Sequence, residues 1–265
     1  MINDLLKTAI QASLEAGEAI MAIYDTPFNV ELKDDNSPLT EADKKANEII
    51  TSHLKSTNTP IISEESKQTD YQIRKSWNTC WIVDPVDGTK EFVKRNGEFT
   101  VNIALAVDQI PVLGVIYVPA TKVLYAADVR EHVAFKACLE AHETTIEDVL
   151  KLSQPLAPNN AKNNTTRVVG SRSHMSQETV DYIDSLESEG KKVEIVSKGS
   201  SLKFCLLAEG LADVYPRFAP TMEWDTAAGQ AICNAVGIEV ISKETNKPLL
   251  YNKENLLNPW FLVSK

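Results

Sequence analysis

Residues 81–89 read Trp-Ile-Val-Asp-Pro-Val-Asp-Gly-Thr. In this stretch an apolar run ends at Asp84, a conformationally rigid proline follows, and Asp87 comes three residues after the first aspartate. The run predicts a buried strand with two carboxylates at its end. Residues 60–65, Pro-Ile-Ile-Ser-Glu-Glu, have the same arrangement, because a short apolar run there ends in Glu64 and Glu65.

Four carboxylates meet at one rim of the core if the ends of these two strands converge. Anions held that close raise one another's pKa, and divalent cations relieve the repulsion. Carboxylates, backbone carbonyls and water are the oxygen ligands that Mg²⁺ prefers. An acidic residue after a strand is by itself more often part of a solvated turn, so only the joint pattern favours a metal site. A calcium-binding EF-hand loop does not fit, because Asp84 and Asp87 are three apart and belong to no alternating series of acids.

The first half of the chain predicts two helices followed by antiparallel strands. Apolar residues recur at helical spacing over residues 2–24, and a second helix follows over 40–55. At its start, Thr40 and Asp43 have the spacing of a capping box. Alternating apolar residues then predict an antiparallel meander with strands over 99–107, 112–118 and 123–127.

The second half predicts a change of architecture. Residues 144–152 look helical, and the Pro- and Asn-rich residues 154–166 predict a surface loop near a domain boundary. Strands and helices then alternate over 167–236, as in α/β domains. We therefore predict a layered α/β fold with an N-terminal α+β part over 1–135, which holds most of the proposed metal ligands, and a C-terminal α/β part over 136–265.

The composition limits which binding partners and which cellular compartment we expect. The chain has 265 residues, with 27 basic and 37 acidic residues that give a formal charge of −10. This charge argues against extended nucleic acid, but it does not exclude a small polyanion that binds where metal ions reverse the local field. The first helix is interrupted by charges, unlike a signal peptide, and no apolar run is long enough to span a membrane. We expect a cytoplasmic protein with buried free thiols at Cys80, Cys138, Cys205 and Cys233.

A fifth acid lies far along the chain. Residues 222–229 read Met-Glu-Trp-Asp-Thr-Ala-Ala-Gly, so Asp225 stands just before a predicted helix that opens with small residues. An N-cap aspartate is the ordinary explanation. The small residues would also let the helix approach another backbone closely, which suits a ligand delivered across a domain interface.

Three separated motifs together resemble the lithium-sensitive, magnesium-dependent phosphatase superfamily that includes inositol monophosphatase. They are residues 64–66 (Glu-Glu-Ser), 84–89 and 224–229. Within the superfamily the chain looks most like the bacterial 3′(2′),5′-bisphosphate nucleotidases of the CysQ type, because of residues 90–92, 95–102 and 171–174. The resemblance covers most of the chain and implies the αβαβα sandwich of the inositol monophosphatase and fructose-1,6-bisphosphatase type. The insert over about 138–164 is longer than this subfamily leads us to expect.

The resemblance implies a site for two or three Mg²⁺ ions. Glu64, Asp84 and the backbone carbonyl of Val86 would hold the first ion. Asp84 would be shared with the second ion, which Asp87 and Asp225 would also hold. A third ion would rest on Glu64 and water.

Three further residues would support the chemistry in this family. Glu65 would support the metal ligands without binding a metal ion itself. Asp43 would accept a hydrogen bond from the Thr89 hydroxyl, and this pair would help to take a proton from the attacking water. For Asp43 the capping box remains an alternative role.

Substrate contacts also follow from the resemblance. Ser173 and His174 would lie beside the nucleotide, while Ser200, Lys203 and Arg217 would contact it and its 5′-phosphate. The rest of the implied substrate-binding set lies around the metals: Glu64, Asp87, Gly88, Thr89, Lys90 and Asp225. Exposed N–H groups where a helix begins near Ser200 independently favour phosphate. Each cation is by itself more often a solvated surface charge, and His174 a loop histidine.

The expected activity is removal of the 3′-phosphate from adenosine 3′,5′-bisphosphate (PAP), which gives AMP and phosphate during sulfate assimilation and nucleotide recycling. The 5′-phosphosulfate analogue (PAPS) is a second expected substrate. An inositol or sugar monophosphatase with the same metal site is one alternative, and a non-catalytic nucleotide or phosphate sensor is another. We expect a monomer or homodimer without a stable protein partner, and the resemblance adds a peripheral association with the cytoplasmic face of the inner membrane.

Overall fold

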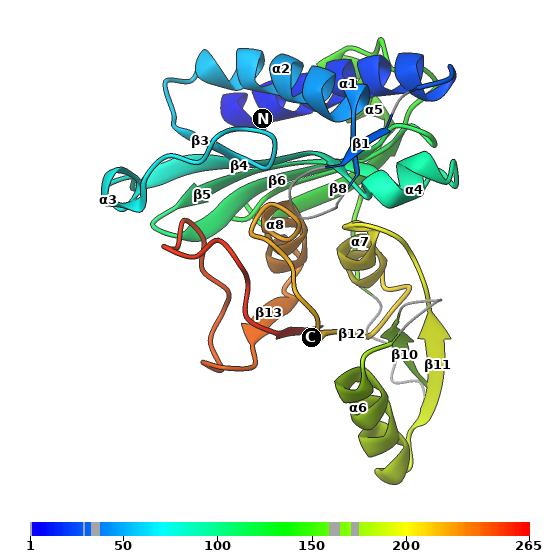
Figure 1. Cartoon of the computed structure of the whole chain (residues 1–265). Coiled ribbons are helices and arrows are strands. Elements are labelled where there is room, and N and C mark those ends of the chain that lie inside the picture. Colours follow the sequence, from blue (N-terminus) through cyan, green and yellow to red (C-terminus); the bar gives the residue numbers. More distant parts are fainter. Residues whose placement is uncertain (1, 29, 33–37, 159–164, 171–174) are drawn as a thin grey trace.

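Five layers of helices and sheets alternate in the protein (Figure 1). The structure is a computed structural model, and it describes residues 2–28, 30–32, 38–158, 165–170 and 175–265. The layers are a helix pair, a seven-stranded sheet, a second helix pair, a five-stranded sheet and an outer helix. The predicted αβαβα sandwich is confirmed.

The larger sheet, as far as the described residues show it, has the strand order β3-β4-β5-β6-β7-β8-β9. In that order the strands span Ile61–Ser63, Thr79–Asp87, Thr100–Val107, Ile110–Val118, Val123–Asp128, Val133–Cys138 and Ser153–Pro155. β3 and β4 run parallel, so their carboxyl ends meet at one edge of the sheet. The other neighbouring strands are antiparallel, which confirms the predicted meander.

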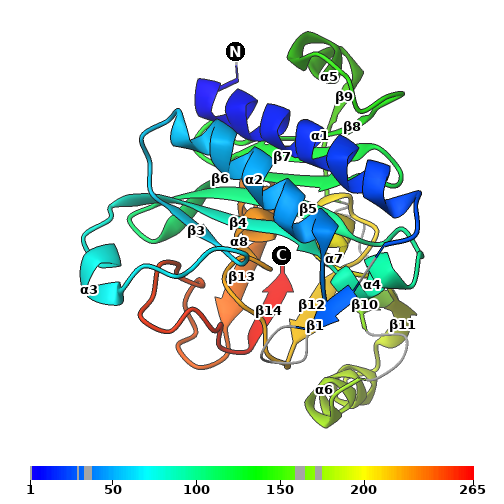
Figure 2. The ribbon, with the colours of Figure 1, turned by 45° about the horizontal axis from the view of Figure 1, so that its top comes forward.

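Two helices, α1 (Asp4–Tyr24) and α2 (Glu41–Lys55), cover the outer face of this sheet (Figure 2). Both lie within one or two residues of the predicted ranges, because each has an amphipathic repeat and a side-chain cap at its start. A Cβ added at Gly17 would overlap the ring of Tyr117, so glycine at this position lets α1 pack closely on β6. No helix in the described part of the chain combines the length and the apolar character that crossing a membrane requires.

The smaller sheet has the order β11-β10-β12-β14-β13 over the described residues. These strands span Lys192–Val196, Thr165–Val169, Val214–Arg217, Phe261–Ser264 and Glu239–Ser242. β10 pairs in parallel with β11 and β12, in agreement with the predicted strand–helix alternation, while β14 runs antiparallel to its neighbours. Helix α6 (Gln177–Ser188) packs against the outside of this sheet.

Helices α7 (Leu202–Ala208) and α8 (Ala227–Ala235) fill the layer between the sheets. A Cβ added at Gly114 of β6 would lie 2.6 Å from the carbonyl oxygen of Ala228 in α8. Small residues on both elements therefore permit the close approach that the sequence predicts for α8.

Short elements complete the fold. They are β1 (Val30–Leu32), β2 (Pro38–Thr40), α3 (Tyr71–Arg74), α4 (Thr89–Val93) and α5 (Ile146–Leu152).

Two predictions are wrong in detail. The predicted loop over 154–166 begins within β9, because its backbone pairs with β8 at the edge of the larger sheet. Cys138 is exposed, since strand alternation turns Ala137 inward and its neighbour outward, whereas the other three cysteines are buried free thiols. The domain division at 135/136 stays a prediction, and the chain passes from the first sheet to the second after Pro155.

Candidate active site

Acidic residues converge where β3 and β4 end. Glu64 directly follows β3, and its N–H donates to the carbonyl of Val83 in β4 at 3.1 Å. Asp84 lies within β4 and is 1% exposed. Carboxylate oxygens of Glu64, Asp84 and Asp225 lie within 4.8 Å of one another, and among the described residues these three form the group that could share a metal ion. Glu65, next along the chain, is partly buried.

Burial and mutual repulsion raise the pKa values of this cluster. Desolvation raises the pKa of Asp84 well above its ordinary value, and the charges of Glu64 and Asp87 raise it further. Desolvation and then the charge of Asp87 raise the pKa of Asp225 to about 7. A buried group of carboxylates is unfavourable when all of its members are ionised. The cluster therefore fits a hard divalent cation, both in its charge and in its oxygen donors.

Asp225 reaches the cluster from a segment between β12 and α8. Its Oδ2 accepts the N–H of Met222 at 2.7 Å. Thr226, not Asp225, is the N-cap of α8, and it makes no side-chain cap hydrogen bond. The N-cap explanation of Asp225 is therefore wrong, and the turn back to Met222 leaves the carboxylate beside Glu64 and Asp84.

Asp87 is held by residues of both halves of the chain. Its Oδ2 accepts the N–H of Ser201 at 2.6 Å, the side-chain amide of Asn102 at 3.3 Å and the hydroxyl of Thr100 at 3.4 Å. In the register of β4 and β5, Thr100 lies opposite Asp87 and Asn102 lies opposite Asp84. Sequence reasoning missed these three partners. Alternation puts Thr100 and Asn102 on one face of a strand, but only the register shows which acids they face.

The carboxylate of Asp43 accepts hydrogen bonds both from the capping box of α2 and from Thr89. Its Oδ2 accepts the N–H and the hydroxyl of Thr40 at 2.8 and 2.6 Å, and the capping box of α2 is complete. Its Oδ1 accepts the hydroxyl of Thr89 at 3.3 Å. The same hydroxyl lies 3.3 Å from the carbonyl oxygen of Val86. The two explanations of Asp43 are therefore compatible, because each uses a different oxygen.

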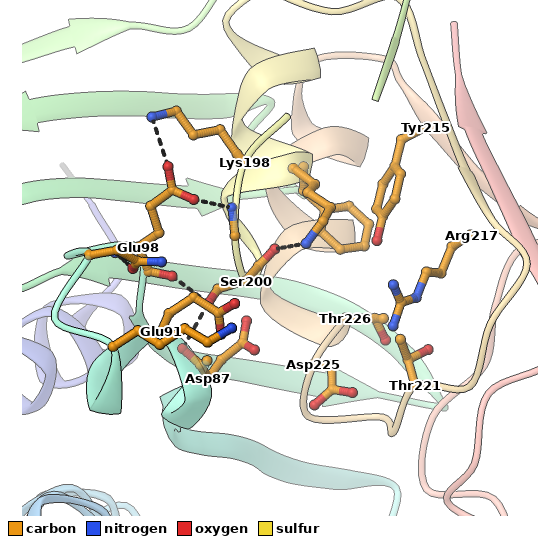
Figure 3. A pocket seen from close by; sticks show the side chains of 16 residues that line it. Asp87, Glu91, Glu98, Lys198, Ser200, Tyr215, Arg217, Thr221, Asp225 and Thr226 are labelled. Atoms are coloured by element: carbon orange, nitrogen blue, oxygen red, sulfur yellow. Dashed lines mark hydrogen bonds and ion pairs between the residues drawn. The ribbon is translucent and has the colours of Figure 1, made fainter. Parts of the chain in front are cut away.

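A pocket of about 400 Å³ opens beside the cluster, between the two halves of the chain (Figure 3). It is lined by Asp87, Gly88, Glu91, Lys94, Asn96, Glu98, Lys198, Gly199, Ser200, Lys203, Phe204, Tyr215, Arg217, Thr221, Asp225 and Thr226. Burial lowers the pKa of Lys203, although the charge of Asp87 acts in the opposite direction. The Nε atom of Arg217 is buried and has no hydrogen-bond partner among the described residues. Such an unpaired donor at a pocket wall suits an anionic ligand.

Ser200 joins the two halves of the site. Its hydroxyl lies 2.9 Å from the carbonyl oxygen of Asp87 and 2.7 Å from that of Glu98. The carboxylate of Glu98 also accepts the N–H of Gly199 at 2.8 Å. Gly88 has a φ of +91°, and a Cβ there would overlap the Oγ of Ser200, so both the backbone and the contact require glycine.

Three further sequence-predicted contacts are not found at the pocket among the described residues. Lys90 is exposed and is not among the residues that line the pocket. Ser173 and His174 lie outside the described residues.

The chain belongs to the inositol monophosphatase family, which it matches over residues 1–260. This is a family of metal-dependent phosphatases, and the acidic cluster is compatible with metal binding. Within it, the chain is similar to the 3′(2′),5′-bisphosphate nucleotidase CysQ of Escherichia coli strain K12. The two are 43% identical over 265 residues, which cover 98% of this chain and 99% of the relative.

Solved structures agree with this relationship. The crystal structure of CysQ from Bacteroides thetaiotaomicron has a TM-score of 0.87 and 51% sequence identity, and the match covers 98% of this chain and 97% of that one. The extragenic suppressor protein SuhB from Bartonella henselae has a TM-score of 0.76 at 23% identity, and the match covers 99% and 94% of the two chains. The latter similarity supports the fold.

Proposed function

We propose that this chain is a Mg²⁺-dependent 3′(2′),5′-bisphosphate nucleotidase that converts PAP to AMP and phosphate. The observation that carries the proposal is the carboxylate cluster of Glu64, Asp84 and Asp225 beside a pocket with Lys203 and Arg217 in its wall. The carboxylate cluster suits metal ions and the phosphate that is cleaved. The cationic wall with Lys203 and Arg217 suits a second phosphate of the same substrate. The name of the E. coli relative supports the same substrate class.

Five residues would hold the Mg²⁺ ions in this proposal: Glu64, Asp84, Val86 through its carbonyl, Asp87 and Asp225. When bound, two or three such ions would supply Lewis-acid charge that activates water and neutralises the transferring phosphoryl group. The chain holds the ligands in place, since Ser201, Asn102 and Thr100 fix Oδ2 of Asp87 and leave Oδ1 for a ligand. Glu65 stays a proposed supporting residue.

Thr89 and Asp43 are the proposed pair that moves a proton. The Thr89 hydroxyl donates to Oδ1 of Asp43, so its oxygen can accept a proton from the attacking water. The N–H and hydroxyl of Thr40 hold the other oxygen of Asp43, which orients this carboxylate toward Thr89.

Lys203 and Arg217 are the proposed contacts of the 5′-phosphate. Gly88 borders the same pocket and stays a proposed substrate contact. The hydroxyl of Ser200 is already engaged by two carbonyls, so its proposed contact with the nucleotide would compete with those bonds. Lys90, Ser173 and His174 stay predicted contacts from family resemblance. PAPS, which carries the same 3′-phosphate, is the proposed second substrate.

Side-by-side phosphate release from PAP and from inositol 1-phosphate, at one Mg²⁺ concentration, tests the proposal. We expect PAP to be hydrolysed at least about tenfold faster in kcat/KM, because a ligand that leaves the buried donor of Arg217 unpaired loses about 1–3 kcal/mol. Comparable or faster turnover of the inositol ester would contradict the nucleotidase assignment.

The proposed setting is the cytoplasm, where sulfate assimilation and nucleotide recycling produce PAP. The proposed partner is the small nucleotide alone, with the protein acting as a monomer or homodimer. Extended nucleic acid is disfavoured by the charge of −10.

A further inference from the structure

Glu223, Arg74 and Lys253 belong to a buried network that adjoins the segment carrying Asp225, and the proposed reaction does not use them. We propose that Arg74 and Lys253 are positioning residues for Asp225 and act through the buried carboxylate of Glu223. The inference rests on the proposed function, because Asp225 is one of its metal ligands.

The carboxylate of Glu223 collects donors from one short segment. Its side chain is 0% exposed and lies two residues before Asp225 in the sequence. Oε1 accepts the Nζ and the N–H of Lys253 at 2.5 and 3.0 Å, and Oε2 accepts the N–H of Asn252 at 2.5 Å. A buried ion pair is rarely the most stabilising choice for such a position, whereas loss of one partner is strongly unfavourable. The pair therefore holds residues 252–253 against Glu223 in a single arrangement.

Arg74 extends this network toward the segment that follows β3. It is 3% exposed, and its Nη1 donates to Oδ1 of Asn252 at 2.7 Å and to the carbonyl of Lys253 at 3.1 Å. Asn252 donates back to the carbonyl of Arg74 at 2.8 Å. Upstream of α3, Gln68 donates to the carbonyl of Ser63 at 2.7 Å. Arg74 also donates through Nε to the carbonyl of Thr69 at 2.9 Å, so the segment from Gln68 to Arg74 connects the turn after β3, which carries Glu64, with the residues that bind Glu223.

The segment that carries Asp225 depends on such bonds. Residues 221–226 lie outside the named helices and strands, and one isolated antiparallel bridge between Met222 and Leu257 pairs their backbone with residues 256–258. Asn258 donates to the carbonyl of Met222 at 2.8 Å and to the hydroxyl of Thr226 at 2.9 Å. Residues 252–258 thereby hold this segment before and after Asp225. The N–H of Met222 in turn donates to the carboxylate of Asp225. Displacement of Glu223 would move a metal ligand relative to Glu64 and Asp84.

Metal binding to the metal-free protein tests this role without any measurement of activity. Mn²⁺ is titrated into each variant, and the EPR signal of the free ion gives the dissociation constant. We expect Lys253→Met to raise the Mn²⁺ dissociation constant about tenfold, as is usual when a residue that orients a metal ligand is removed. We expect Lys253→Arg, which keeps the charge and the donor, to stay within about twofold of the wild type.

Lys136 offers a matched control. Its Nζ lies 2.6 Å from Glu209, and its side chain is 28% exposed against 26% for Lys253. This pair joins β8 to α7, but Glu209 is the C-cap of α7 at the end opposite to Ser201, about 12 Å along the helix. Lys136→Met should lower the melting temperature yet leave the Mn²⁺ dissociation constant within about twofold of the wild type.

The outcomes separate this inference from the proposed function. A folded Lys253→Met that binds Mn²⁺ like the wild type would overturn the positioning role, as would an equal weakening in Lys136→Met.

If Lys253→Met does not fold, Asn252→Gly replaces it. Asn252 has a φ of +59°, which glycine adopts freely, and its loss cuts the link to Arg74. Unchanged binding in that variant would also overturn the role. If Asp225→Asn binds Mn²⁺ normally, the metal-site assignment itself fails.

Discussion

The carboxylate of Asp87 is shared between the two halves of the molecule. Ser201, from the second half, donates to the same oxygen that Thr100 and Asn102 contact from β5. An asparagine at this position could keep an oxygen toward Ser201, but it would lose the negative charge that a metal ion requires.

We expect Asp87→Asn to fold like the wild type and to lose PAP hydrolysis by more than about a hundredfold. Circular dichroism and phosphate release measure the two effects. Asp108→Asn, at an exposed position in the turn between β5 and β6, is the matched control and should keep full activity. An active Asp87→Asn enzyme would show that the site is misassigned.

The raised pKa of Asp225 affects the stability of the metal-free protein. This carboxyl has an ordinary pKa of 3.8, and burial raises it to about 7 in the folded chain. Between these values the folded state binds more protons than the unfolded state, so the free energy of unfolding falls as the pH rises through this window. Metal ions that pair with the ionised cluster should reverse this loss above pH 7.

We expect urea unfolding in EDTA to show a steeper loss of stability from about pH 4 to pH 7 for the wild type than for Asp225→Asn, which cannot titrate there. Saturating Mg²⁺ should stabilise the wild type more at about pH 8 than at about pH 5, because protons compete with the metal. Parallel pH profiles for the two proteins would contradict the assigned pKa.

Among the elements, the contact between α8 and β6 matters most for the site, since α8 begins two residues after Asp225. The backbone of α8 lies against Gly114, where an added methyl group would meet both Ala228 and Ala231. An alanine there would have to push the helix outward.

We expect Gly114→Ala to lower the free energy of unfolding by about 1–3 kcal/mol through overpacking. Turnover of PAP should also fall, by up to about a hundredfold, because a shift of about 1 Å misplaces a catalytic ligand. Gly190→Ala is the control, since Gly190 has a φ of +81° with no atom within 4 Å of an added Cβ. It should lose about 1–2 kcal/mol but keep its turnover. Full activity in Gly114→Ala would show that the position of α8 does not limit the reaction.

Elements differ in how well their own residues predict them. The amphipathic repeat and side-chain caps of α1 and α2 lie within each helix, so the predicted ranges agree closely with the structure. β9 contains only three residues, of which Gln154 and Pro155 are exposed, so nothing local distinguishes it from a loop. It forms because the edge of β8 offers unpaired backbone groups.

For the molecule as a whole, the charge of −10 describes the surface better than the site. The two or three divalent ions of the proposal would add a charge of +4 to +6 at the site. They would reverse the sign of the electrostatic potential at the place where the phosphate binds. Two large apolar clusters, one on each face of the larger sheet, hold the fold, and the four proposed carboxylate ligands belong to neither of them.

We therefore expect EDTA to abolish PAP hydrolysis while the circular dichroism spectrum stays unchanged at 25 °C, and readdition of Mg²⁺ to restore activity. The metal should raise the melting temperature, since binding at about a hundredfold excess over the dissociation constant contributes about 2.7 kcal/mol. Chelation that unfolds the chain would contradict this division between core and site.

Local sequence was sufficient for the two N-terminal helices, the meander and the acids near the carboxyl ends of β3 and β4, because periodicity, caps and strand ends are properties of neighbouring residues. Family resemblance then joined Asp225 and Asp43 to those acids. The folded chain alone shows that Asp225 turns back to Met222, that Ser201 binds Asp87, and that Glu223 lies against Lys253. The last two contacts join residues that are distant in the chain, and their approach is set by how the two sheets pack around α7 and α8.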